Sequence, residues 1–197
     1  MRIVILAKPV PDSTGQERLG ADGRLDRGVA PAVINGNDEY VLEAALKLVE
    51  AHGGEITLLA MAQPNAPETL RKGLAMGAHR ATLVTDGALA GSCSLGTARV
   101  LAAALRTLSY DLVMAGADSS DGGGGVVPAA IATYLGLLVL CGGVHLPMLL
   151  LPEWKAGQSA LHATRCLSPF TALVAITQDA FGNMGSHASA AALARYF

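Results

Sequence analysis

Residues 111–128 read DLVMAGADSSDGGGGVVP, and this stretch decides the fold. It joins a short apolar run to a glycine-rich loop and then to the start of another apolar segment. An apolar run of strand length, a glycine loop and a helix together form one unit of a strand–helix repeat. Ligands of open parallel sheets bind beyond the carboxyl ends of the strands, so the loop at 116–125 is the first candidate site.

The same alternation extends toward residue 1. Strands that alternate with helices imply a parallel sheet with right-handed crossovers. We therefore predict an α/β fold, a Rossmann-like open parallel sheet with helices on both faces and the strand at 2–7 central. On the third helix, Leu95, Ala98 and Leu101 are predicted to share the buried stripe. The predicted strands are residues 2–7, 55–61, 80–84 and 111–115, and the predicted helices are residues 38–51, 64–76, 94–108 and 126–134.

The caps of these helices follow from polar residues at their starts. Asn37 or Asp38 is expected to cap the first helix, and Ser92 or Ser94 the third. The pattern weakens after residue 137. Three later segments have strand character and one has helical character. These are residues 138–140, 160–164 and 172–177 for strands, and 188–196 for a short helix.

Composition limits the class of protein. Of the 197 residues 51% are hydrophobic and 15% charged, which predicts one domain with a large core over residues 1–197. A net charge of −2 argues against binding to nucleic acid. The three cysteines form no Cys-x-x-Cys pair, and no signal peptide is apparent, so we expect reduced thiols in a cytoplasmic protein.

One segment imitates a membrane span. Residues 126–151 contain no Asp, Glu, Lys or Arg and are long enough to cross a bilayer. Pro128, Gly136 and Pro147 divide the segment, however. We therefore predict a buried helix followed by a buried strand, and no transmembrane segment.

The glycine loop is the most informative candidate site. Glycines let backbone N–H groups approach an anion, and the helix that follows adds a favourable partial charge. The loop therefore fits a phosphate-binding turn, although a merely flexible surface loop remains an alternative. Asp118 and Asp121 are expected to bond their own backbone rather than a metal. Because no nucleophile or general base can be identified, the sequence favours a binding protein over an enzyme with its own catalytic residues.

Four stretches resemble the beta subunit of electron transfer flavoproteins. The opening RIVILAKPVPD at 2–12 resembles the family's strand-Lys-x-Val-Pro-Asp start. The stretch VINGNDEY at 33–40 resembles its Asn-Pro-x-Asp-Glu-Tyr motif. The stretch ETLRKGLAMGAHRA at 68–81 is similar to Leu-Arg-Lys-Ala-Leu-Ala-Met-Gly-Ala-Asp-Arg-Ala. The stretch at 111–122 is similar to Asp-Leu-Val-x-x-Gly-x-x-Ser-x-Asp-Gly.

The resemblance implies a fold of the adenine nucleotide alpha hydrolase-like kind and an electron carrier that is not itself an enzyme. It implies a heterodimer with an alpha subunit that holds the redox FAD, and electron exchange with a flavoprotein dehydrogenase or other oxidoreductase. The beta subunit itself is expected to hold AMP structurally, or FAD. Carried over by position, the adenine side is Leu6, Asn35, Gly36, Asn37, Asp38 and Met61. The phosphate side is Gly116, Asp121, Gly122, Gly123, Gly124, Gly125, Val126 and Val127.

The chain also departs from the family pattern. Where the family loop has Asp, Thr and Gln, this sequence has Gly123, Gly124 and Val126, so side-chain phosphate donors are missing. Residues 138–197 resemble an abbreviated form of the partner-docking portion. The sequence thus suggests a shortened, divergent beta-type subunit. The alternatives are a scaffold of the same fold that binds no nucleotide and a stand-alone nucleotide-handling enzyme, which no catalytic constellation supports.

Overall fold

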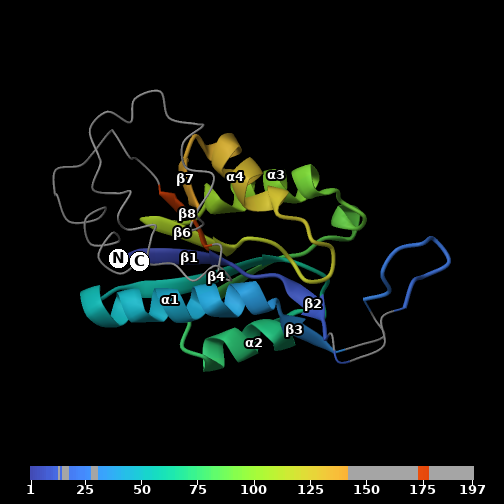
Figure 1. Cartoon of the computed structure of the whole chain (residues 1–197), viewed down its shortest axis with the longest axis horizontal. Coiled ribbons are helices and arrows are strands. Elements are labelled where there is room, and N and C mark those ends of the chain that lie inside the picture. Colours follow the sequence, from blue (N-terminus) through green and yellow to red (C-terminus); the bar gives the residue numbers. More distant parts are fainter. Residues whose placement is uncertain (13, 15–17, 28–30, 142–172, 178–197) are drawn as a thin grey trace.

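The fold is known from a computed structural model that describes residues 1–12, 14, 18–27, 31–141 and 173–177. Figure 1 shows one mixed sheet between two layers of helices. The strand order is β5-β4-β1-β6-β8-β7, and a separate pair, β2 and β3, lies beside it. The strands are β1 (Arg2–Leu6), β2 (Pro9–Pro11), β3 (Ala32–Ile34), β4 (Glu55–Met61), β5 (Arg80–Val84), β6 (Leu112–Gly116), β7 (Leu138–Cys141) and β8 (Leu173–Thr177). The helices are α1 (Gly36–His52), α2 (Pro67–Ala75), α3 (Ser94–Leu105) and α4 (Val126–Leu135), with a short 3-10 turn at Gly87–Leu89.

The predicted parallel core of the sheet is confirmed. β1 pairs in parallel with β4 on one side and with β6 on the other, and β4 pairs in parallel with β5. The chain therefore moves outward from β1 through β4 to β5 and then returns to the opposite side of β1. The order reverses between β1 and β6, which is the topological switch point where such sheets bind ligands.

The far edge of the sheet departs from a purely parallel arrangement. β8 runs antiparallel to β6 and also to β7, between which it lies. β7 consequently runs in the same direction as β6, as the intervening α4 would suggest. The expected strand at 172–177 is present, but its direction differs. The segments at 160–164 and 188–196 lie outside the described residues.

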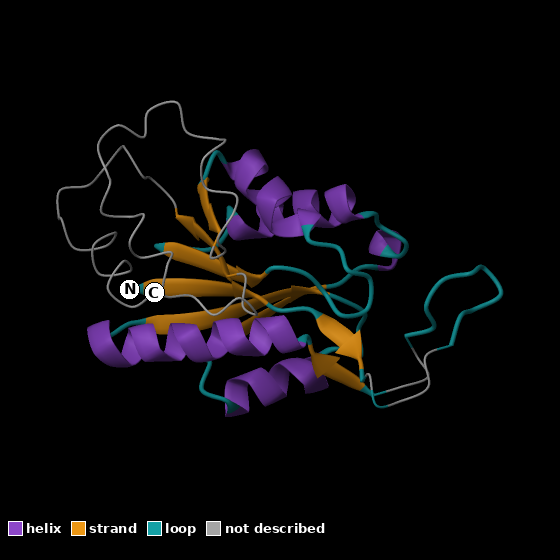
Figure 2. Ribbon diagram, in the orientation of Figure 1, coloured by secondary structure: helices purple, strands orange, loops and turns teal. Residues whose placement is uncertain are grey.

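Alternate residues of the central strands enter different hydrophobic cores. Ile3 and Ile5 pack in the core that includes α1 and α2, whereas Val4 and Leu6 pack in the core that includes α3 and α4. Figure 2 shows these helices on opposite faces of the sheet. Because both faces are buried, the strands read as continuous apolar runs. The first charged residue after β1 is Lys8, which leaves the sheet at its carboxyl edge.

Three helix starts differ from the predicted ones. α1 begins at Gly36 with Asn35 as N-cap, not Asn37 or Asp38, since the N–H of Asp38 donates to the Asn35 carbonyl at 2.8 Å. α2 begins at Pro67 rather than residue 64, because Ala66 N–H donates to the Gln63 carbonyl in a preceding turn. For α3 the N-cap is Cys93, not a serine.

The predicted buried stripe of α3 was wrong for one residue. Ala98 and Leu101 are buried, but Leu95 is 54% exposed. Leu95 belongs to the first turn of α3, at the carboxyl edge of the sheet, where the helix is no longer covered. The helix also ends at Leu105 and continues to residue 108 only as turns.

The charge-free stretch that begins at residue 126 divides as expected within the described part of the chain. It forms α4, which ends at Leu135 and is capped by Gly136 in a left-handed conformation, and then the strand β7. Among the described residues, every helix is too short or too polar to traverse a lipid bilayer.

Candidate functional site

A cavity of about 580 Å³ lies beyond the carboxyl ends of β1, β4 and β6. The turn after β5, the first turns of α3 and α4, and the β2–β3 pair complete its wall. The segments that follow the four parallel strands, residues 7–11, 61–63, 85–91 and 116–125, all contribute to it. Its size falls within the range typical of sites for small ligands and cofactors.

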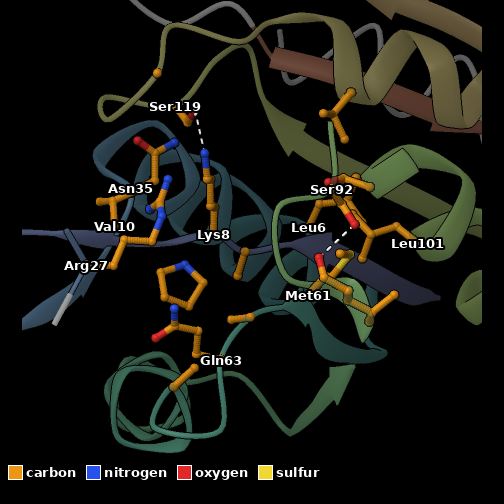
Figure 3. A pocket seen from close by; sticks show the side chains of 18 of the residues that line it. Leu6, Lys8, Val10, Arg27, Asn35, Met61, Gln63, Ser92, Leu101 and Ser119 are labelled. Carbon is orange, nitrogen blue, oxygen red and sulfur yellow. Dashed lines mark hydrogen bonds between the residues drawn. The ribbon is translucent and has the colours of Figure 1, made fainter. Parts of the chain in front are cut away.

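The lining of the cavity has an apolar side and a polar side. Figure 3 shows Leu6, Met61 and Leu101 together on one side of the view. Lys8 and Arg27 lie on the other side, near Asn35 and Ser119. A cavity divided in this way suits a ligand that has a flat apolar part and an anionic part.

The first turn of α1 holds the loop that follows β6. Asn35 is buried at 1% exposure, and its side-chain amide bonds the loop twice. Its Nδ2 donates to the carbonyl of Asp118 at 2.8 Å, and its Oδ1 accepts the N–H of Ser120 at 3.1 Å. Asn37 adds a hydrogen bond to the Asp118 carboxylate. These two amides therefore fix the loop and do not stand free for a ligand.

Asp38 joins the ends of β1 and β6 at the switch point. Its carboxylate accepts the N–H of Lys8 at 2.8 Å and the N–H of Gly116 at 3.1 Å. Burial raises the pKa of Asp38 to about 6, although these hydrogen bonds act in the opposite direction. A Cβ at Gly116 would lie 2.8 Å from the Cβ of Asn37, so only glycine permits this close approach.

Lys8, Arg27 and Asp121 form an ionic cluster on the polar side. Lys8 Nζ donates to Asp121 Oδ1 at 2.7 Å and to Ser119 Oγ at 2.9 Å, the latter drawn in Figure 3. Arg27 Nη1 pairs with the other oxygen, Asp121 Oδ2. Burial alone would raise the pKa of Asp121, but hydrogen bonds from Lys8 and Arg27 outweigh it and hold that pKa below its ordinary value.

The glycine run is a turn that closes mostly on itself. The N–H groups of Gly122 and Gly123 both donate to the Ser119 carbonyl, at 3.3 and 2.7 Å. Gly125 N–H donates to the Gly123 carbonyl at 3.2 Å, and Gly123 needs its positive φ of 58°. Within the described part of the chain, Gly124 N–H has no such partner. Three of the four N–H groups of the glycine run are therefore already used within the loop.

The structure brings some of the predicted binding residues into the cavity wall and leaves others behind it. Their role in binding stays a prediction in either case. Those that line the cavity are Leu6, Asn35, Asp38, Met61, Gly116, Gly122, Gly124 and Val127. Those outside the wall are Gly36, Asn37, Asp121, Gly123, Gly125 and Val126.

Sequence reasoning missed the two cations of the polar side. Lys8 stands in one of the quoted motifs, but no role was assigned to it. Arg27 lies in a long polar stretch without periodicity, and nothing local indicates that it reaches the loop after β6. Only the position of Lys8 directly after a buried strand could have signalled a site residue.

Comparison with known proteins gives one family match and several relatives that are similar over about 70% of this chain. The family described as "Electron transfer flavoprotein domain" matches residues 23–195. Protein FixA of Azorhizobium caulinodans is 42% identical over 145 residues, which are 71% of this chain and 52% of FixA. The electron transfer flavoprotein subunit beta of Clostridium acetobutylicum is 39% identical over 137 residues, 70% of this chain and 53% of that subunit. The chain thus spans about half the length of these relatives.

Proposed function

The chain belongs to the electron transfer flavoprotein family, and from this premise we propose that it is a beta-type subunit that binds an adenine nucleotide. Its relatives include proteins named electron transfer flavoprotein subunit beta, a name for an electron carrier rather than for an enzyme. In this proposal a flavin carries the electrons, and the chain supplies binding and position.

The observation that carries the proposal is the two-sided cavity at the switch point. Its apolar side offers Leu6 and Met61 to a flat base, and its polar side offers Lys8 and Arg27 to a phosphate. The residues present therefore fit AMP, and they equally fit the AMP portion of FAD. The position beyond the carboxyl ends of parallel strands also supports a nucleotide.

We further propose that the chain pairs with an FAD-carrying alpha-type subunit in the cytoplasm. Electrons would then pass between a flavoprotein dehydrogenase or other oxidoreductase and an acceptor. The family match supports the pairing, and residues 138–197 are proposed as its docking portion within a single domain. If the chain is coexpressed with such a subunit, a sizing column should show one joint peak. Two separate peaks would contradict the pairing.

A scaffold that binds no nucleotide is the second candidate. It is favoured by the replacement of side-chain donors with Gly123, Gly124 and Val126, and by the loop N–H groups that turn inward.

Denaturing the purified chain and separating the extract against AMP, ADP and FAD standards distinguishes the two candidates. The proposal expects about one AMP or FAD per chain, either as purified or after incubation and desalting. An extract without any of the three, after incubation with each, would favour the scaffold.

A further inference from the structure

The polar side of the cavity carries two cations that share a single carboxylate. We infer that Lys8 and Arg27 recognise the phosphate of the ligand and thereby select phosphorylated adenosine over adenosine itself. This inference rests on the proposed nucleotide function and assigns the charge recognition to the turn after β1 and to the segment between β2 and β3, rather than to the glycine loop.

The three charged groups of the ionic cluster differ in whether they reach the cavity. Lys8 and Arg27 line the cavity, and their side chains are 42% and 39% exposed. Asp121 does not line the cavity, and its side chain is only 3% exposed. Within this cluster the two positive charges therefore face the ligand space, and the carboxylate of Asp121 lies behind them. Asp121 orients both cations without meeting the ligand.

Three other carboxylates line the cavity, and each accepts hydrogen bonds from the protein. Asp38 accepts two backbone N–H groups, those of Lys8 and Gly116. Asp86 accepts the N–H of Ala88 at 2.8 Å, and Asp118 accepts the amide of Asn37. Their negative charge is thus partly compensated by dipoles, whereas the cations have donor hydrogens left over. An arginine has five N–H donors and a lysine three, and Asp121 uses only part of them.

The glycine loop supplies less than its composition suggests. The N–H groups of Gly122 and Gly123 are already directed to the Ser119 carbonyl, so they do not point at a ligand. An arginine fork can contact two phosphate oxygens at once, and a lysine adds a compact charge. Lys8 and Arg27 are therefore better placed to recognise a phosphate than the loop beside them.

Arg27 also gives the long segment between β2 and β3 a function. In Figure 1 part of this segment extends away from the body of the molecule. Of the residues described in this segment, Arg27 lines the cavity and contacts Asp121. Arg18 belongs to the same segment, is exposed and does not line the cavity, which makes it a matched control.

Titration calorimetry with AMP and with adenosine tests the inference on the full chain. The unsubstituted chain should bind AMP at least about tenfold more tightly than adenosine, as one charge-assisted hydrogen bond can supply that factor. Arg27→Gln and Lys8→Met should each weaken AMP by about tenfold and leave adenosine within about twofold. Arg27→Lys should lose less AMP affinity than Arg27→Gln, and Arg18→Gln should change neither ligand.

Each remaining outcome has a separate meaning. If neither AMP nor adenosine binds the unsubstituted chain, the proposed function is wrong. If both bind and the preference for AMP survives in Arg27→Gln and Lys8→Met, nucleotide binding stands but the recognition assigned here is overturned. An equal loss of AMP and adenosine in these variants also overturns it, because the residues would then only support the fold.

Discussion

Asp38 shows how one buried residue ties the site together. Burial raises its pKa to about 6 from the ordinary value of 3.8, while it accepts the N–H groups of Lys8 and Gly116. Between these two pH values the folded chain keeps a proton on Asp38 that the unfolded chain has released. Since the folded state then binds more protons at Asp38, the contribution of Asp38 to the free energy of unfolding decreases as pH rises through this window.

Asp38→Asn is expected to remove this dependence, because an amide does not titrate. The free energy of unfolding of the unsubstituted chain, minus that of the variant, should fall by up to about 3 kcal/mol between about pH 4 and about pH 7. Urea denaturation of both proteins at the two pH values measures the difference.

Asp111 supplies a control of opposite sign. A hydrogen bond from Arg2 lowers the pKa of Asp111, so its stabilising effect is present at higher pH and is lost only as pH falls below the ordinary range. The difference in free energy of unfolding between the unsubstituted chain and Asp111→Asn should therefore show little slope above about pH 4. Parallel pH profiles for the unsubstituted chain and Asp38→Asn would mean that Asp38 remains charged throughout.

At the residue scale, the sequence predicted some residues of the candidate site and missed others. The glycine loop and Asn35 could be identified because glycine runs and family motifs are local signals. Lys8 and Arg27 could not be assigned, since their common partner Asp121 is far away in the chain and only the fold brings them together. Ion pairs of this kind depend on tertiary structure and cannot be predicted from the hydrophobic periodicity of the sequence.

At the element scale, apolar runs predicted the strands closely. β4 and β5 have the predicted bounds, β1 ends one residue earlier than predicted, and β6 is displaced by one residue at both ends. Helix starts were less predictable, because several residues near each start can cap and the competition is decided by tertiary contacts. The side chain of Asn35, for example, bonds the loop after β6 and makes no cap hydrogen bond within α1.

The loop before α4 allows a prediction at this scale. A Cβ at Gly124 would lie 3.8 Å from Ser94 Oγ and meet no backbone atom, and Gly124 lines the cavity. Gly124→Thr should therefore add a hydroxyl donor and tighten AMP binding by about tenfold. Val126 is 55% exposed and lies outside the wall, so Val126→Gln should change the affinity less than about twofold. The structure thus separates Gly124 from Val126, although the sequence indicated a missing phosphate donor at both positions.

Titration calorimetry on each single variant measures this contrast. Gly123→Thr serves as the strained comparison, because its φ of 58° suits glycine and not a β-branched residue. An equal gain from Gly124→Thr and Val126→Gln would show that α4 moves when the ligand binds.

At the scale of the whole molecule, the sequence predicted the parallel direction of the four core strands and the central place of β1, but not the direction of β8. Alternation of strands and helices predicts parallel pairs, and β5, β4, β1 and β6 obey it. β8 inserts antiparallel between β6 and β7, and an apolar run carries no information about the direction in which it pairs. The switch point between β1 and β6 is unaffected, so the site remains where the parallel core places it.

Under the proposed function, this architecture makes nucleotide binding depend on the entire fold. The cavity wall takes residues from β1, β4, β6, α3, α4 and the β2–β3 pair, so unfolding of the chain must release the ligand.

A ligand that binds only the folded state, present at about 100 times its Kd, stabilises that state by about 2.7 kcal/mol. For a chain of this size, AMP at that concentration should raise the Tm by roughly 5–10 °C in a thermal scan. Ribose 5-phosphate, which keeps the phosphate for Lys8 and Arg27 but has no base for Leu6 and Met61, should raise the Tm much less at the same concentration. Equal shifts in Tm from the two compounds would show that the apolar side contributes nothing to binding. The absence of any shift with AMP would show that the cavity does not bind this nucleotide.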